Sequence, residues 1–224
     1  MRYVLFILCL VTYPLHGQIT GLSMAAGTQS IVQTSAASEW LYEDYFTTRT
    51  NGSLDGQGAW DAGQGGAVVA LDGADKIVYP NNAGANSILT YDMAIDSNQY
   101  CEVLYTSEAA SNGIGPGVNI QANGTSGHGL YSTPSASYLV RVSGGGEAVL
   151  ATGDPWSVDD VAALWSHGDT LKVLINGVLD TSIDTDGKYT KTVDDHSNGQ
   201  AGLVTWGNSA SSFITYWRLK VRNE

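Results

Sequence analysis

Short runs of apolar and β-branched residues, separated by turn-forming residues, follow one another along most of the chain. In the run 213–221, apolar side chains dominate one set of alternate positions and polar side chains the other, as in a half-buried antiparallel strand. The run 87–95 also has a clearly apolar face. The strands expected from this pattern are 67–71, 76–79, 87–95, 100–106, 117–121, 138–142, 148–151, 171–175, 177–179, 200–206 and 213–221.

The turns between these runs predict that neighbouring strands pair in an antiparallel sense. Asn176-Gly177 joins two β-type runs, and Asn-Gly is the strongest short hairpin signal because a type I′ turn needs positive φ at both central residues. Asn123-Gly124 and the segments 72–75 and 143–146 are further turn signals.

One segment departs from the β pattern. Residues 158–165 are expected to form one or two turns of helix, opened by Asp154-Pro155 or by Ser157. Strands elsewhere recur every ~10–15 residues, and the sequence contains no internal repeat or second linker. We therefore expect one all-β domain, an antiparallel two-sheet β-sandwich.

The composition supports this fold class. The chain of 224 residues contains 27 Gly and 5 Pro, which favour turns, and 12 Tyr and 6 Trp, which can fill a large core. Trp60 and Trp217 are expected in that core. Cys101 is expected to be a small buried residue, since Cys9 would be lost with the N-terminal segment and no disulfide framework would remain.

Several segments resemble the signature pieces of concanavalin A-like and LamG-like domains. Asp44-Tyr45-Phe46 followed by Trp60 resembles their D-x-F … G-x-W opening, and segment 168–177 resembles a G-D-x-L-x-V-x-x-N-G hairpin. Segments 184–186 and 197–203 resemble D-x-x-Y … S-G-x-x-G-L, and the last run matches the closing strand of the family. The resemblance covers residues 43–222 and implies a jelly-roll sandwich. It leaves the ligand open, because this fold hosts lectins, glycan-binding modules, glycosidases and adhesive or virion parts.

The N-terminus has the layout of a secretory signal peptide. Arg2 provides a positive charge, residues 4–11 are uninterruptedly apolar, and Gly17 provides a small residue for cleavage. The apolar run is shorter than the ~20 residues that span a bilayer. We expect residues 1–17, or residues up to about Ala25, to be removed during export. If translation starts at Met24, the protein would instead be cytosolic or part of a virion.

Residues 18–40 are rich in Ser, Thr, Ala and Gly and are expected to form a linker or arm before a domain at 41–224. Such an arm could join copies of the protein by adding a strand to a sheet edge. The net charge of −12 argues against binding to nucleic acid or to anionic membranes. It suits neutral glycans, cations or basic partners.

The sequence offers little support for catalysis. Glycoside hydrolysis needs two facing carboxylates, and the E-x-D-x-x-E string of laminarinase-like enzymes is absent. Glu102 and Glu108 are the one remaining pair, but Glu108 falls near the end of its expected strand. The His residues are scattered, so a zinc site is not expected.

Aromatic side chains in loops are the candidates for contact with a sugar, together with a nearby amide. Trp156 is the first choice because it follows Asp154-Pro155 and has no evident position in the core; the alternative is that it packs under its loop. The full candidate set is Trp156, Trp165, Tyr131, Trp206 and Asn208.

Calcium is the metal that the sequence could hold. Ca²⁺ prefers oxygen ligands from carboxylates and carbonyls, and two acidic turns provide Asp184, Asp186, Asp194 and Asp195. These residues could also be a set of solvated acidic loops.

Three functions remain open from the sequence. An exported, non-catalytic glycan-binding module is favoured, with a glycan or polysaccharide as partner. A structural or adhesive subunit of a surface, filament or virion is the alternative, and a glycoside hydrolase is a lesser one.

Overall fold

The computed structural model describes residues 40–64, 67–72, 75–80, 86–91, 98–106, 113–121, 124–144, 146–183, 188–191, 199–207 and 213–222. The chain from Trp40 to Glu224 forms one compact unit. Residues 1–39, which contain the expected signal peptide and most of the arm, lie outside the described residues. No helix in the described part of the chain is long and apolar enough to cross a membrane.

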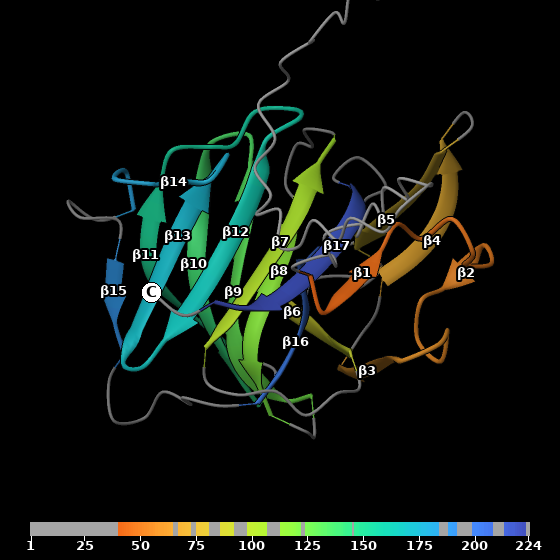
Figure 1. The fold of residues 1–224 in the computed structure, drawn as a ribbon, viewed down its shortest axis with the longest axis horizontal. Coiled ribbons are helices and arrows are strands. Elements are labelled where there is room, and N and C mark those ends of the chain that lie inside the picture. Colours follow the sequence, from red (N-terminus) through yellow and green to blue (C-terminus); the bar gives the residue numbers. More distant parts are fainter. Residues whose placement is uncertain are drawn as a thin grey trace, which may run out of the picture. The chain divides into compact units, whose positions relative to one another are not determined.

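The described strands form two antiparallel sheets, stacked as a sandwich (Figure 1). The first, sheet A, has the order β14-β13-β12-β7-β17-β5-β4-β2, with β1 beside β17 and β15 beside β13. Its strands are β1 (Tyr42–Asp44), β2 (Gly52–Ser53), β4 (Ala67–Asp72), β5 (Asp75–Pro80), β7 (Gln99–Tyr105), β12 (Val161–His167), β13 (Thr170–Ile175), β14 (Val178–Leu179), β15 (Lys188–Thr190) and β17 (Ile214–Val221).

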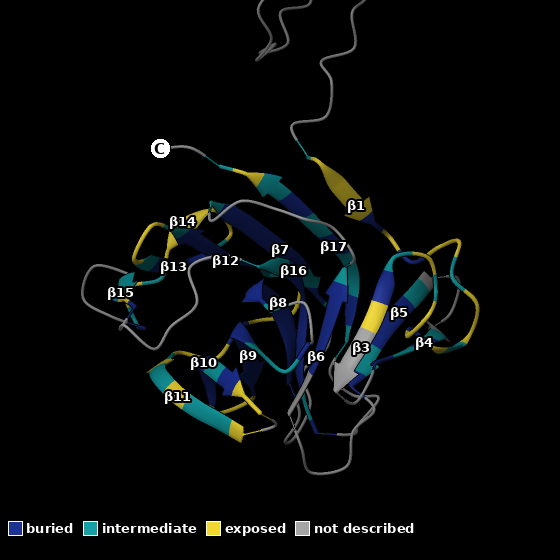
Figure 2. Cartoon of the chain, turned by 90° about the horizontal axis from the view of Figure 1, so that it is seen from below, coloured by how far each residue is buried: buried dark blue, intermediate teal, exposed yellow. Residues whose placement is uncertain are grey.

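The second, sheet B, has the order β11-β10-β9-β8-β16-β6-β3. Its strands are β3 (Trp60–Gln64), β6 (Asn86–Tyr91), β8 (Gly113–Ile120), β9 (Ser126–Thr133), β10 (Ala136–Ser143), β11 (Gly146–Gly153) and β16 (Gln200–Trp206). In Figure 2 the two sheets arch in the same direction and sheet B lies inside the arch of sheet A. The side of sheet B that faces away from sheet A is therefore concave. The predicted fold class, an all-β two-sheet sandwich, is confirmed.

The main core lies between the sheets and follows from the alternation of the strands. In β17, Trp217 and Leu219 are fully buried, whereas Arg218 and Lys220 are only partly buried. Ile214 is also buried, because a register shift between Ile214 and Tyr216 changes the face on which the first residue of the strand lies. The core predictions for Trp217 and for Cys101, which are both 0% exposed, are confirmed.

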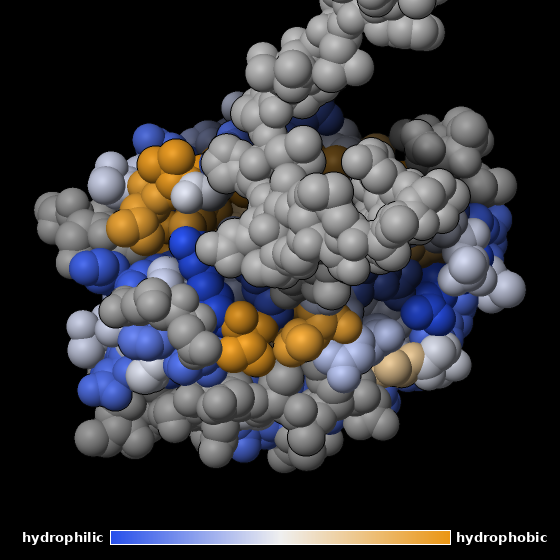
Figure 3. Space-filling view, viewed as in Figure 1, coloured by the Kyte–Doolittle hydropathy of each residue, from blue (hydrophilic) through white to orange (hydrophobic). Residues whose placement is uncertain are grey.

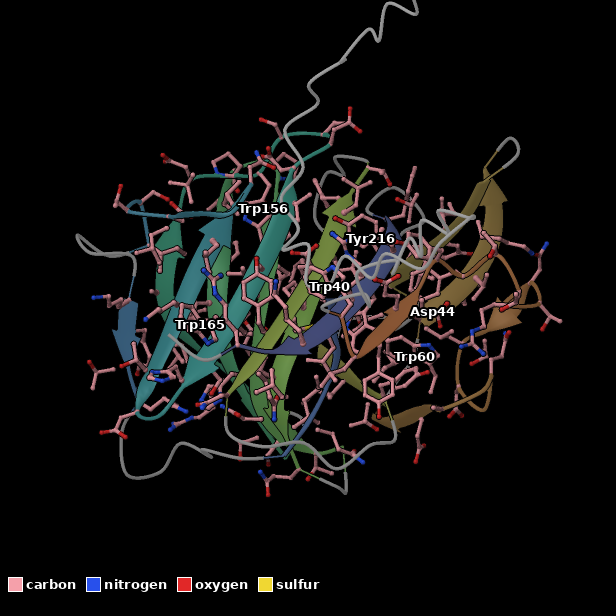
Figure 4. The ribbon with its side chains drawn as sticks, viewed as in Figure 1. Trp40, Asp44, Trp60, Trp156, Trp165 and Tyr216 are labelled. Carbon is pink, nitrogen blue, oxygen red and sulfur yellow. The ribbon has the colours of Figure 1, made fainter. Side chains whose placement is uncertain are left out.

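The opening motif of the resemblance has a structural explanation in the Asp44 carboxylate, which is buried. Oδ1 of Asp44 accepts the backbone N–H of Phe46 at 2.7 Å, and φ of Phe46 is 59°. Oδ2 accepts Nη2 of Arg49 at 2.7 Å and Nε1 of Trp60 at 2.7 Å. Trp60 in turn packs edge-on against Trp217 with ring centroids 5.1 Å apart, so the motif ties the start of the domain to its last strand (Figure 4).

The hairpin prediction is confirmed. Asn176 and Gly177 join β13 to β14 with φ values of 52° and 79°, the positive pair that a type I′ turn requires. Nδ2 of Asn176 donates to Asp160 at 2.7 Å, and its Oδ1 accepts the N–H of Val161 at 2.9 Å.

The prediction of a helix at 158–165 is wrong. Ser157 to Asp160 form a turn, in which the Ser157 N–H donates to Oδ2 of Asp160 at 2.7 Å, and β12 begins at Val161. Residues 162–166 of β12 are all buried, because one side faces the core and the other packs on the outer side of sheet A. A strand buried on both sides loses its apolar–polar alternation, which is why the sequence pattern indicated a helix.

Candidate functional site

The concave side of sheet B carries a second hydrophobic cluster, separate from the core between the sheets. We call this side, with the aromatic residues Tyr131, Tyr138 and Trp206 upon it, the concave face. Its buried members are Ile88, Ile120, Tyr131, Val140, Val142 and Val204, and Tyr138 and Trp206 pack against them while remaining partly exposed.

Glycines make room for this cluster. A Cβ atom at Gly129 of β9 would lie 2.3 Å from Cγ2 of Val204, and one at Gly113 of β8 would lie 2.3 Å from the ring of Tyr131. Real Cβ atoms do not approach so closely, so side chains from the flanking strands lie directly over the glycine backbone. The glycines at 113, 115 and 117 occupy alternate positions of β8, so at these positions the strand itself adds no side chain.

Aromatic rings from three strands meet on this face, two of them on the strands that flank β8. Tyr131 of β9 and Trp206 of β16 are parallel, with ring centroids 6.3 Å apart and an interplanar angle of 3°. Tyr138 of β10 lies directly opposite Tyr131 in the strand register, and its ring centroid is 5.4 Å away. Tyr131 is 4% exposed and supports the other two rings, which reach solvent.

A carboxylate accompanies the rings. Tyr131 donates its hydroxyl to Oε1 of Glu147 at 2.9 Å. Burial, and then the charge of Glu147, raise the pKa of the Tyr131 hydroxyl well above its ordinary value. The hydroxyl therefore stays protonated and holds Glu147 in place. The concave face thus presents partly exposed ring surfaces on a fixed aromatic support, which suits the C–H groups of a ligand.

Two of the predicted ligand residues, Tyr131 and Trp206, are brought together here. They lie in strands rather than in loops, so the predicted loop placement is wrong for both. Asn208, the amide in the predicted set, lies outside the described residues.

Trp156 lies between strands and packs in the core between the sheets, so the structure favours the alternative left open for it over ligand contact. It is 3% exposed and meets the ring of Tyr105 edge-on at 5.5 Å (Figure 4). Its backbone N–H donates to Oγ of Ser132 at 2.9 Å. This fold has enough depth between its sheets to take a large ring from a connecting segment, which local sequence does not reveal.

Trp165 belongs to a different surface. It lies in β12 on the outer side of sheet A, is 6% exposed, and has Nζ of Lys172 4.0 Å from its ring centroid. The prediction that Trp165 lies in a loop is therefore wrong, and the residue is not on the concave face.

The proposed calcium ligands Asp184, Asp186, Asp194 and Asp195 all lie outside the described residues. Within the described ranges, no group of three or more His, Cys, Asp or Glu side chains could hold a metal ion. Calcium therefore stays a prediction.

Of the candidate catalytic pair Glu102 and Glu108, only Glu102 is among the described residues. Glu102 is engaged by Nε of Arg218 at 3.0 Å and by the hydroxyl of Tyr216 at 3.3 Å.

Tyr138 and Glu147 were not predicted from the sequence. Their signal was available in part: the run 138–142 was expected to be a strand, and the alternating glycines at 113–117 indicate a strand approached closely by its neighbours. The register that places Tyr138 opposite Tyr131 is a tertiary property.

Comparison with protein-family models gives no match for this chain, and comparison with curated proteins gives none. Solved structures do match. A carbohydrate-binding module of the CBM66 type from Bacillus subtilis superposes with a TM-score of 0.51 at 15% identity, covering 72% of this chain and 92% of the module. A Bacillus subtilis protein of unknown function with a galectin-like fold also gives a TM-score of 0.51, at 10% identity, covering 77% of this chain and 97% of that one. At these identities the similarity establishes the fold.

Proposed function

We propose that this protein is an exported, non-catalytic glycan-binding module that holds its ligand on the concave face. The observation that carries the proposal is the parallel pair of Tyr131 and Trp206 above a strand of alternating glycines, with Tyr138 and Glu147 beside it. The carbohydrate-binding module with a similar fold supports the same ligand class.

The residues of the concave face contribute to binding in different ways. The partly exposed rings of Trp206 and Tyr138 offer apolar surfaces for the C–H face of a sugar. Glu147 accepts the hydroxyl of Tyr131 and so fixes the ring that supports Tyr138 and Trp206. Export is supported by the charged and apolar start of the sequence, and the non-catalytic role by the lack of a carboxylate motif in it.

The test is a binding screen of the purified protein against neutral glycans and polysaccharides. We expect at least one ligand to bind, and Trp206→Ala and Tyr138→Ala each to weaken its binding about 10-fold or more, as is usual for truncation of a central aromatic contact. Trp40→Ala, a matched truncation on the outer side of sheet A, should retain the affinity. Repeating the screen with a calcium chelator tests the calcium prediction separately.

Failure of the folded protein to bind any neutral glycan would contradict the proposal. Equal weakening by Trp206→Ala and Trp40→Ala would place the ligand elsewhere or indicate a general loss of structure.

A further inference from the structure

The outer side of sheet A carries cations and aromatic rings in strict alternation. We call this series the cation–aromatic ladder. Its members in spatial order are Lys172, Trp165, Arg222, Tyr100, Lys220, Trp40, Arg218 and Tyr216.

One half of the ladder is centred on Arg222. Nζ of Lys172 lies 4.0 Å from the ring centroid of Trp165, and Cζ of Arg222 lies 4.4 Å from the same centroid. Cζ of Arg222 is also 5.1 Å from the ring centroid of Tyr100. The Arg222 guanidinium is therefore held between two rings.

The other half continues along β17. Nζ of Lys220 lies 5.0 Å from the ring centroid of Tyr100 and 4.3 Å from that of Trp40. Cζ of Arg218 lies 4.3 Å from Trp40 and 4.5 Å from Tyr216. Figure 4 shows Trp165, Trp40 and Tyr216 along one diagonal across the sheet, and Figure 3 shows strongly hydrophilic residues between hydrophobic patches on this side.

The strand registers build the ladder. Lys172, Trp165, Tyr100 and Lys220 are opposite one another on four consecutive strands, so their side chains share a row. Positions 216, 218 and 220 alternate along β17, with a repeat of about 6.8 Å per two residues. The cations are thus fixed in two directions on a rigid sheet.

The charge of this face opposes that of the protein. The ladder holds four of the ten Lys and Arg residues of a chain whose net charge is −12. Glu102 pairs with Arg218 at one end of the ladder. Burial and the charge of Glu102 raise the pKa of Tyr216 to about 12, so its hydroxyl is neutral at physiological pH.

Arg222 is differently placed from Arg218. Among the described residues, no carboxylate pairs with the Arg222 guanidinium, which lies over the rings of Tyr100 and Trp165. A guanidinium is always charged and presents a fork of N–H donors suited to carboxylate or sulfate groups. The rings hold it in position, so an anion would bind without first ordering the side chain.

We infer that the cation–aromatic ladder binds an anionic polysaccharide, with Arg222 as the central contact and Lys220 beside it, since both are partly exposed whereas Lys172 is buried. A polymer with repeated carboxylate or sulfate groups is complementary to a fixed row of cations. Single-stranded nucleic acid fits less well, because its bases need free ring faces for stacking. The rings of Trp165 and Trp40 each have cations over them. This inference is independent of the concave face.

The experiment measures binding of the whole protein to polygalacturonate and to dextran sulfate, with neutral dextran as the uncharged comparison. We expect binding to one of the anionic polymers and none to dextran. Raising NaCl from 50 to 200 mM should weaken binding on the order of 10-fold if two cations engage the polymer.

Arg222→Gln and Lys220→Gln should each weaken binding at least 5-fold. Lys76→Gln, which removes the same charge from β5 outside the ladder, should change it less than 2-fold. Thermal unfolding of each variant checks that the fold is intact, and neutral glycan binding at the concave face should be unchanged in all three.

Three results would overturn the inference. One is equal weakening by Lys76→Gln and Arg222→Gln, which would indicate a general charge effect. Another is tighter binding of single-stranded DNA than of either anionic polysaccharide. The third is self-association of the protein that Arg222→Gln abolishes, which would identify a second copy as the occupant.

Discussion

Replacement of Asp44 by asparagine is expected to destabilise the domain strongly, although the side chain keeps nearly the same shape. Oδ2 of Asp44 accepts hydrogen bonds from Nε of Arg49 at 3.0 Å, from Nη2 of Arg49 at 2.7 Å and from Nε1 of Trp60 at 2.7 Å. Oδ1 accepts the N–H of Phe46 at 2.7 Å. Asparagine has one acceptor oxygen and one NH₂ group. In one orientation its NH₂ group faces the N–H of Phe46, and in the other it faces the N–H groups of Arg49 and Trp60, so a donor always faces a donor.

The size of the effect follows from burial. Side-chain exposure is 5% for Asp44 and 18% for Arg49, and Trp60 is 1% exposed. The N–H donors that lose their acceptor in the variant therefore cannot form full replacement hydrogen bonds with water. Removing one partner of a buried ion pair costs about 3–5 kcal/mol, and Arg49 can recover some of this at the surface. We expect a loss of about 3 kcal/mol, which lowers Tm by about 6–12 °C in a domain of this size.

The assay is urea unfolding followed by tryptophan fluorescence, with thermal unfolding as a second measurement. Asp61→Asn is the matched control, because Asp61 is exposed and its substitution removes the same charge. The control should stay within about 0.5 kcal/mol of the wild type. If the stability of Asp44→Asn lies within about 1 kcal/mol of that of Asp61→Asn, the buried network around Asp44 does not contribute the expected stabilisation.

Three further outcomes are expected. The Cys101 thiol is fully buried, which raises its pKa strongly, so it should resist N-ethylmaleimide in the folded protein and react after unfolding, as read by mass spectrometry of its peptide. Gly129→Ala should destabilise by about 1–3 kcal/mol through collision with Val204, and the cost should fall when Val204→Ala is already present; additive costs would argue against that contact. Because burial raises the pKa of Tyr131 and Tyr216, the folded state binds more protons than the unfolded state above pH 10, so stability should fall as pH rises from about 10 to 12; a tyrosinate absorbance titration in which every tyrosine of the folded protein ionises with a midpoint near pH 10 would contradict this.

Much of the fold is predictable from the sequence because local patterns and architecture agree. The alternation in β17 and the Asn176-Gly177 turn each have a local physical cause, and both occur as expected. The segment that becomes β12 could not be recognised, because its two buried sides remove the alternation that identifies a strand.

The candidate site is less predictable because it depends on register between distant strands. Tyr131 and Trp206 could be nominated as aromatic residues near turns, but their parallel arrangement depends on β8 lying between β9 and β16. The cation–aromatic ladder is harder still to predict from the sequence, because the position of Arg222 between Tyr100 and Trp165 depends on residues from three distant parts of the chain.

The concave face as the glycan site is tested most directly by hydroxyl-radical footprinting of the protein with and without a bound neutral glycan. Trp206 and Tyr138 should become protected in the complex, while Trp40 and Tyr216 on the outer side of sheet A keep their reactivity. Protection of Trp40 and Tyr216 with none at Trp206 and Tyr138 would contradict the account, because the glycan would then lie on the opposite side of the sandwich.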